Sequence, residues 1–273
     1  MIKILQVRNI DSLVESRRQK TSEKDRKTVQ AILNDVKRNG DSAVKKYERK
    51  FNGTKTSRLR VSVKEIKEAR SKISRKEYAI LGTMKYTLLT EQERLGYYLK
   101  DFPPSGRRSL RYGIALPQKR SFIPIPSVGC YIPGGQARYP SSAIMSVVPA
   151  RIAGVKRIVV VSPPGRDGKI DPLTIAAAKK FGATEIYKVG GAQAIGALAY
   201  GTKSIPKVDK IVGPGGKFVS IAKSLVSDQT SIDMIAGPTE LGIIADSSAD
   251  PKLVVLDLIS QAEHSNDTMC FVI

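Results

Sequence analysis

The chain has 273 residues, and its 46 Lys and Arg residues against 25 Asp and Glu residues give a formal net charge of +21. This charge excludes an acidic or neutral surface. With 41% hydrophobic and 26% charged residues, the composition is that of a globular protein, not of a disordered or collagen-like one. No apolar run approaches the ~18–20 residues of a membrane-spanning helix, and charges interrupt the N-terminal apolar stretch that a signal peptide would need.

The two cysteines, Cys130 and Cys270, do not form a C-x-x-C pair. We therefore expect a reduced, cytoplasmic protein. With one histidine and two widely separated cysteines, this chain alone cannot build a closed tetrahedral zinc site from nitrogen and sulfur ligands. A metal site of that kind needs ligands from elsewhere.

The N-terminal part of the sequence predicts helices. Ser22 and Asp25 form a capping-box pattern, and apolar residues follow at helical spacing. Ser62 and Glu65 form a second such pattern. Helices are expected over residues 22–38, 41–51, 62–73 and about 76–99. We assign residues 1–125 to a mainly helical region in which basic side chains are spread along the sequence.

From Val128 onward the sequence changes to short β-branched runs, each ended by Gly or Pro and followed by a helical pattern. Strands are expected over residues 127–131, 157–161, 185–189 and 209–212, and helices over residues 141–153, 172–181, 192–200 and 217–227. Four successive units of this kind predict a parallel sheet with helices on both faces, because parallel strands need crossover connections. We assign residues 126–236 to a Rossmann-like α/β domain.

The C-terminal residues 237–273 predict the start of a further α/β segment. A strand is expected over 241–245, and a helix then begins with Asp250 as its cap and Pro251 at its first position. Residues 268–273 have the pattern of a buried strand. Because an apolar strand with nothing after it is an unprotected edge, we expect the sequence to be truncated here.

Three glycine-rich turns follow predicted strands: Ile132–Gly135, Gly190–Gly196 and Gly213–Gly216. Ligands bind at this edge of an open α/β sheet, and glycines let the backbone and the next helix N-terminus approach a phosphate. None of the turns matches G-x-G-x-x-G, so each by itself is explained equally well by a tight strand-to-helix connection. Three such turns at one edge favour a bound dinucleotide.

Gln261 and His264 are three residues apart on a predicted helix, so both side chains can reach one ion. Imidazole suits zinc, and a Gln carbonyl is a weaker oxygen ligand. The alternative is that His264 only interacts with the helix dipole. Thr239 and Glu240 lie in a polar turn between apolar runs, where they can meet a substrate or simply satisfy the turn.

The basic surface also allows a hypothesis of a different class, a nucleic-acid-binding protein on a non-catalytic α/β scaffold. The charges lack interleaved aromatic residues and a known binding module. A solvated, Lys-rich surface is the simpler explanation of the charge.

Four ordered motifs closely resemble the histidinol dehydrogenase family. They are Val128-Gly-Cys-Tyr-Ile-Pro-Gly-Gly135, Val189-Gly-Gly-Ala-Gln-Ala-Ile-Gly196, Ile232-Asp-Met-Ile-Ala-Gly-Pro-Thr-Glu240 and Ser260-Gln-Ala-Glu-His264. Upstream, residues 35–41 and 50–53 resemble that family's N-terminal helices more weakly. The resemblance covers the whole chain but only about three-fifths of the family's usual length.

The resemblance implies the aldehyde dehydrogenase-like superfamily and a zinc enzyme that oxidises L-histidinol through an aldehyde to L-histidine, the last step of histidine biosynthesis. It implies two NAD molecules used in sequence, with residues 126–236 as the NAD-binding domain. It also implies a homodimer whose zinc site draws ligands from both subunits.

By position, Tyr131, Gln193 and Gly216 resemble the family's NAD contacts. Thr239 resembles its substrate-contacting Ser, and Gln261 and His264 resemble two ligands of zinc and substrate. Gly216 stands where the family commonly has an Asn, which removes one cofactor contact, whereas Thr239 keeps the hydroxyl of the Ser.

The family's catalytic Glu-His pair and its other zinc ligands, an Asp and a His, belong to the portion beyond Ile273. Oxidation of an alcohol needs a base that takes the hydroxyl proton, and the resemblance already assigns the single histidine here to zinc. We therefore expect no catalytic residue within this chain and no turnover by the chain alone.

Overall fold

The computed structural model describes residues 23–54, 58–84, 123–134, 138–235, 240–263 and 268–273. Its helices are α2 (Glu23–Asn39), α3 (Asp41–Asn52), α4 (Val63–Ser71), α6 (Pro140–Ile152), α7 (Pro172–Phe181), α8 (Gly191–Tyr200), α9 (Lys217–Val226) and α10 (Pro251–Ala262). Its strands are β1 (Ser127–Tyr131), β2 (Arg157–Ser162), β3 (Glu185–Lys188), β4 (Lys210–Val212), β5 (Ser231–Ile232), β6 (Glu240–Ile243) and β7 (Met269–Val272). Residues 75–84 are also helical. Among these described segments, no helix has the length and apolar character needed to cross a bilayer.

Five strands form a parallel sheet in the order β3-β2-β1-β4-β5. The chain moves outward from β1 through β2 to β3, and then returns to the other side of β1 to form β4 and β5. The strand order therefore reverses between β1 and β4, which is where open α/β sheets bind ligands. The predicted parallel sheet is confirmed. The two-residue strand β5 was not predicted, because so short a run shows no alternation.

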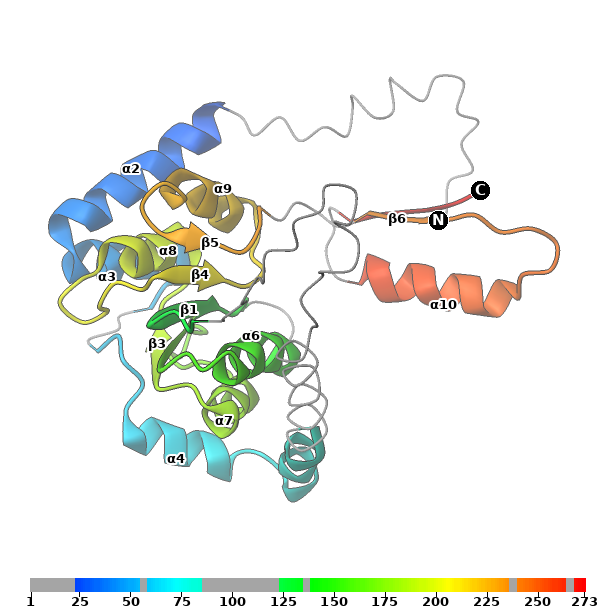
Figure 1. The fold of residues 1–273 in the computed structure, drawn as a ribbon, viewed down its shortest axis with the longest axis horizontal. Coiled ribbons are helices and arrows are strands. Elements are labelled where there is room, and N and C mark those ends of the chain that lie inside the picture. The colour runs from blue at the N-terminus through cyan, green and yellow to red at the C-terminus, as the bar shows by residue number, and fades with distance from the viewer. Residues whose placement is uncertain (1–22, 55–57, 85–122, 135–137, 236–239, 264–267) are drawn as a thin grey trace, which may run out of the picture.

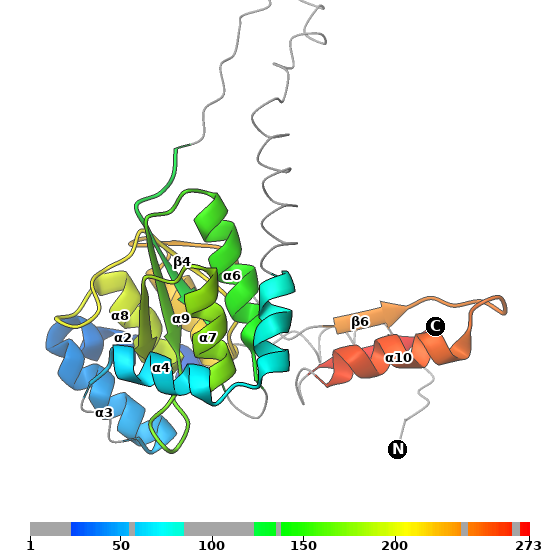
Figure 2. The same ribbon diagram turned by 90° about the horizontal axis from the view of Figure 1, so that it is seen from below.

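Apolar side chains alternate between the two faces of the sheet. On β2, Val159 and Val161 belong to one buried cluster, and Ile158 and Val160 belong to the other. A strand covered on both faces needs apolar residues at successive positions, which explains its β-branched run. Helices α2, α3, α8 and α9 lie on one side of the sheet, and α4, α6 and α7 lie on the other (Figures 1 and 2).

The N-terminal helix α2 packs against α8. Its buried side chains, Val29, Ile32, Leu33 and Val36, follow the spacing of one helix face. On α8, a Cβ added at Gly196 would lie 3.1 Å from Leu33 Cδ2, so the absence of a side chain allows this close approach. The contact holds α2 and the adjoining α3 against the sheet domain.

Helix α4 begins with the predicted capping box. The Glu65 N–H donates to Ser62 Oγ at 3.2 Å, and the Ser62 N–H donates to Glu65 Oε2 at 2.7 Å. The other Glu65 oxygen accepts from Lys188 Nζ at 2.6 Å. The box therefore also ties α4 to the carboxyl end of β3.

Residues 240–273 form a β6-α10-β7 unit whose two strands are parallel. Asp250 caps α10 by accepting from the Lys252 N–H at 2.8 Å, as predicted. The prediction that the last strand is buried is wrong: Phe271 and Val272 are 43% and 47% exposed. The physical reason is that the unit stands apart from the main sheet, and no other described element covers it (Figures 1 and 2).

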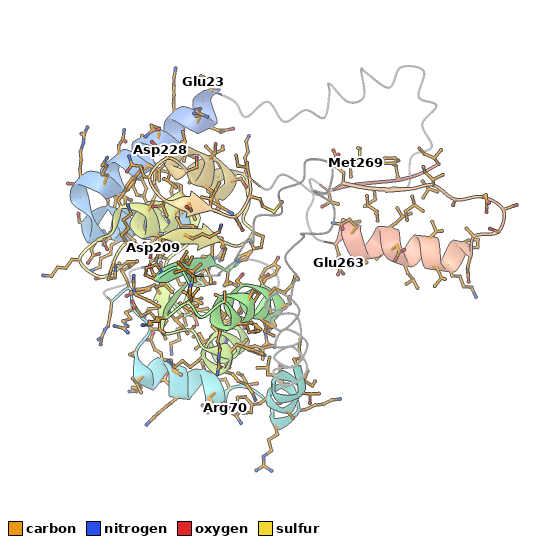
Figure 3. All side chains as sticks on the ribbon, viewed as in Figure 1. Glu23, Arg70, Asp209, Asp228, Glu263 and Met269 are labelled. Atoms are coloured by element: carbon orange, nitrogen blue, oxygen red, sulfur yellow. The ribbon has the colours of Figure 1, made fainter. Side chains whose placement is uncertain are left out.

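No residue of α10 is buried. Leu253, Leu256 and Ile259 are each more than half exposed, although they are apolar. Figure 3 labels Glu263 at the end of α10 and Met269 on β7, and no other described element lies against the outer side of this helix. An apolar surface of this kind is typical of a face that another polypeptide segment covers.

Candidate functional site

Tyr131 ends β1 and links the glycine-rich turns at the strand-order reversal. The Gly191 N–H, at the start of α8, donates to the Tyr131 hydroxyl at 3.1 Å. From the other side, a Cβ added at Gly213 would lie 2.2 Å from the Tyr131 carbonyl oxygen. The turns that follow β3 and β4 therefore both meet Tyr131, as expected for loops at one sheet edge.

The turn after β4 requires a glycine at its first position. Gly213 has a φ of +113°, a conformation that residues with a Cβ rarely adopt. Its N–H donates to Asp233 Oδ2 at 2.8 Å, and its carbonyl oxygen accepts from Lys223 Nζ at 3.0 Å. The N–H and the carbonyl oxygen of Gly213 are therefore both hydrogen-bonded to side chains.

Lys223 and Asp233 form an ion pair beneath this turn. Lys223, on α9, is 2% exposed. Burial by itself would raise the pKa of the Asp233 carboxyl, but hydrogen bonds from Lys223 and from the N–H groups of Gly213 and Met234 outweigh it and lower that pKa. Asp233 is therefore ionised at neutral pH, and the ion pair holds the turn.

The Tyr131 side chain is buried, at 5% exposure. Burial raises the pKa of its hydroxyl to about 12, with the Glu48 carboxylate adding to the effect. Tyr131 is therefore protonated at neutral pH. Its hydroxyl oxygen accepts from the Gly191 N–H, and that bond does not use the hydroxyl proton, for which the described residues show no acceptor.

Gln193, on the first turn of α8, is 1% exposed. Its Nε2 donates to Glu48 Oε1 at 2.8 Å. Its Oε1 is buried and has no hydrogen-bond partner among the described residues. Buried polar atoms normally have a partner, so this oxygen is an acceptor that the described residues leave unsatisfied.

Glu48 reaches this edge from α3 and is fully buried. The same oxygen that accepts from Gln193 also accepts from the Gly190 N–H at 2.8 Å, and its second oxygen accepts from Asn52 Nδ2 at 2.6 Å. Burial raises the pKa of the Glu48 carboxyl, and these hydrogen bonds oppose the rise.

Sequence reasoning missed Glu48, Lys223 and Asp233. A signal existed for two of them. Glu48 lies one turn after Val44 on the apolar face of α3, and Lys223 lies one turn after Val219 on the buried face of α9. A charged residue on an apolar helix face indicates a buried polar partner, but the partner itself comes from a distant part of the chain.

Gly216 is the N-cap of α9, with a φ of −67°. It makes no side-chain cap, and an added Cβ would meet nothing within 4 Å. Unlike Gly213, it faces open space and needs no glycine for its backbone conformation. A ligand can approach the first turn of α9 here.

Of the three residues predicted to bind zinc or substrate, the structure describes only Gln261. Gln261 lies near the end of α10 and is partly exposed. Thr239 and His264 lie outside the described residues. Within the part of the chain that is described, no three His, Cys, Asp or Glu side chains come together to hold a metal ion. Tyr131 and Gln193 are brought to one edge, while Gln261 belongs to the β6-α10-β7 unit.

A cavity of about 730 Å³ lies beside this edge, between α4 and the loops that follow β1 and β2. Its wall includes Gly134, Lys188 and Asn52, the residue that also contacts Glu48. Four of its charged groups pair with one another, Lys188 with Glu65 and Lys169 with Glu68. No sequence motif predicted this cavity.

Residues 15–273 match the family model described as histidinol dehydrogenase. The chain belongs to the histidinol dehydrogenase family. It is 47% identical over 248 residues to the histidinol dehydrogenase of Bacillus licheniformis, which covers 89% of this chain and 55% of the relative. It is 44% identical over 246 residues to that of Methanosarcina mazei, covering 90% of this chain and 55% of the relative.

The fold agrees with a solved member of the histidinol dehydrogenase family. The crystal structure of histidinol dehydrogenase from Elizabethkingia anophelis superposes with a TM-score of 0.74 at 30% identity, covering 99% of this chain and 57% of that one. The chain thus spans about half the length of the relatives it matches. None of these findings supports the nucleic-acid-binding alternative.

Proposed function

We propose that this chain contributes the nucleotide-binding part of a histidinol dehydrogenase that oxidises L-histidinol to L-histidine with NAD and zinc. The proposal includes the cytoplasmic location, the homodimer with a shared zinc site and the aldehyde dehydrogenase-like superfamily that the resemblance implies. It also includes the division of the chain at about residues 125 and 236. Family membership and the strand-order reversal support it.

The observation that carries the nucleotide site is the buried Gln193 Oε1, which has no partner in the described part of the chain and lies on the same helix turn as Gly191, the donor to Tyr131. A dinucleotide offers hydroxyl and carboxamide donors for such an oxygen. The Tyr131 hydroxyl proton is available for an acceptor on the ligand, and Gly216 leaves the start of α9 open. These groups fit NAD, which when bound accepts the hydride removed from the alcohol.

The chain's own residues have binding and orienting roles in this proposal. Tyr131 stays protonated and donates, Gln193 accepts, and the first turn of α9 offers N–H groups and a positive dipole to phosphate. The Lys223 and Asp233 pair keeps the turn after β4 in the conformation that leaves this path open.

Zinc and histidinol are assigned to Thr239, Gln261 and His264. A glutamine oxygen and an imidazole nitrogen are both suitable zinc ligands, but they are two where zinc commonly takes four. The remaining ligands and the base for the hydroxyl proton are therefore proposed to come from the section that the relatives have and this chain does not span. No catalytic residue is assigned within residues 1–273.

The test is NAD binding by purified residues 1–273, measured by isothermal titration calorimetry. We expect saturable binding that Gln193→Leu weakens at least tenfold, since the variant removes the acceptor. The control is Thr83→Val, at an exposed residue of the helix over residues 75–84. This variant should bind NAD as the unmodified chain does. Absence of NAD binding, or unchanged binding by Gln193→Leu, would overturn the nucleotide site.

A further inference from the structure

The carboxylate of Glu48 connects an N-terminal helix to the nucleotide edge. It is fully buried, and a single oxygen accepts from both the Gly190 N–H and Gln193 Nε2, each at 2.8 Å. The residues that meet here are 142 and 145 positions apart in the sequence. Through this contact α3 reaches Gln193, a residue assigned to the cofactor.

One Glu48 oxygen accepts from the Gly190 N–H and from Gln193 Nε2 at the same time, so it acts as an acceptor and determines which way the Gln193 amide points. With Nε2 toward Glu48, the amide oxygen must face away. The opposite orientation would place the Gln193 oxygen against the Glu48 oxygen, with two acceptors in contact in a buried site. That arrangement is strongly unfavourable at low dielectric. The unpartnered state of Gln193 Oε1 is therefore a consequence of Glu48.

The surroundings of Glu48 leave it no other role in binding. Its second oxygen is occupied by Asn52 at 2.6 Å, and its side chain is closed to solvent. The other ionisable group that acts on this site is Tyr131, which is protonated at neutral pH. Both Glu48 oxygens accept hydrogen bonds from the protein, whereas Gln193 Oε1 accepts none from the described residues, so Glu48 acts on a ligand through the groups that it holds.

We propose that Glu48 is a positioning residue that fixes the Gln193 amide so that its oxygen is presented to a hydrogen-bond donor of a pyridine dinucleotide. The inference rests on the proposed NAD site. It adds that Glu48 makes Gln193 present its amide oxygen, and not its NH2 group, to the ligand. The donor on the ligand is a ribose hydroxyl or a carboxamide NH2. A group that only accepts hydrogen bonds does not satisfy this oxygen.

The test is a double-mutant cycle on residues 1–273, with the dissociation constant for NAD measured by calorimetry. Glu48→Met and Gln193→Met should each raise that constant at least tenfold. The double variant should bind no more weakly than Gln193→Met alone, because Glu48 acts through the Gln193 amide. Glu48→Gln keeps an accepting oxygen and should stay within about threefold of the unmodified chain.

Two further variants separate positioning from general structural damage. Glu23→Met makes the same substitution at an exposed acid on α2, labelled in Figure 3, and should leave NAD binding unchanged. Glu48→Asp keeps the charge but withdraws the oxygens. It should weaken binding several-fold in the unmodified chain and have no effect in the Gln193→Met background, which preserves the test if Glu48→Met does not fold.

The outcomes distinguish the two proposals. If Glu48 substitutions weaken binding by the same factor in both backgrounds, the positioning role is overturned and the NAD site stands. If the unmodified chain does not bind NAD, or Gln193→Met binds it equally well, the nucleotide site is overturned and the positioning role with it.

Discussion

Lys223 Nζ donates to the carbonyl oxygen of Gly213 at 3.0 Å, so a buried ammonium on α9 holds the turn that follows β4. The same ammonium pairs with Asp233, whose carboxylate accepts from the Gly213 N–H. The turn is thus fixed by one cation and one anion. Loss of either charge leaves the other without its partner.

Asp233→Asn should lower the free energy of unfolding at pH 7 by about 2–3 kcal/mol, because Lys223 loses a charged partner. The pKa of Asp233 is lowered in the folded protein from its usual value of 3.8. Its contribution is therefore present above about pH 3.8 and is lost as pH falls through the lower folded-state pKa. Urea unfolding of Asp233→Asn and of the unmodified chain, measured from pH 7 to pH 2.5, should show the difference between their free energies of unfolding becoming smaller as the pH falls.

The control for that series is Asp228→Asn, at an exposed acid labelled in Figure 3, which should change stability by less than about 0.5 kcal/mol. A difference between Asp233→Asn and the unmodified chain that stays constant down to pH 2.5 would contradict the assigned ion pair.

Gly213→Ala and Gly216→Ala should behave very differently, although the two glycines share one turn. At Gly213 a Cβ would meet the Tyr131 carbonyl oxygen at 2.2 Å, and its φ is +113°. We expect a loss of about 3 kcal/mol or more. At Gly216 a Cβ meets open space, and the change should stay within about 1 kcal/mol. Thermal unfolding of both variants checks this, and equal losses would contradict the described turn.

Gly216→Asn should strengthen NAD binding. The position is an N-cap with extended backbone that any residue adopts, and an Asn side chain can cap α9 or reach a ligand. One added hydrogen bond corresponds to roughly a threefold to tenfold lower dissociation constant. Calorimetry with Gly216→Ala as the control separates the effect of the Asn amide group on NAD binding from the effect of adding a Cβ. Weaker binding by Gly216→Asn would argue against a ligand at the start of α9.

Histidinol-dependent NADH formation should require a second polypeptide. Residues 1–273 alone, with zinc, should be inactive. Co-expression with the remaining section of the Bacillus licheniformis relative should produce turnover, because that section is proposed to supply the base and the missing zinc ligands. Turnover by residues 1–273 alone would refute the assignment of no catalytic residue.

Leu256→Asp tests whether the second polypeptide covers the exposed apolar face of α10. Leu256 is 60% exposed on α10, so the substitution should leave the unfolding of residues 1–273 unchanged. It should lower the co-expressed activity at least tenfold, because a buried unpaired charge is costly. Full activity of this variant would show that the second polypeptide does not contact α10 at Leu256.

The sequence predicted those elements whose determinants are local. Apolar spacing located α2, a capping box located α4, and β-branched runs followed by glycine or proline located β1 to β4, while the predicted cap Ser22 lies outside the described residues. The motif resemblance also identified Tyr131 and Gln193, and the structure brings both to one edge. It leaves their role in binding NAD as a proposal, since no described contact tests it.

The parts that the sequence did not predict depend on partners far along the chain. Glu48 bonds the distant Gly190 and Gln193 as well as the local Asn52, and Lys223 bonds the turn after β4 and Asp233. Local periodicity shows that such residues lie on an apolar face, but not what they bind there. The burial expected for β7 failed for a related reason, since burial depends on a covering segment.

The β6-α10-β7 unit has a practical consequence for handling the chain. Among the described strands, β6 and β7 pair only with each other, so each leaves an outer row of peptide groups open to solvent. Beside them lies α10, whose apolar side chains Leu253, Leu256 and Ile259 are exposed. We therefore expect copies of the chain to associate through the open edges of β6 and β7 at high concentration.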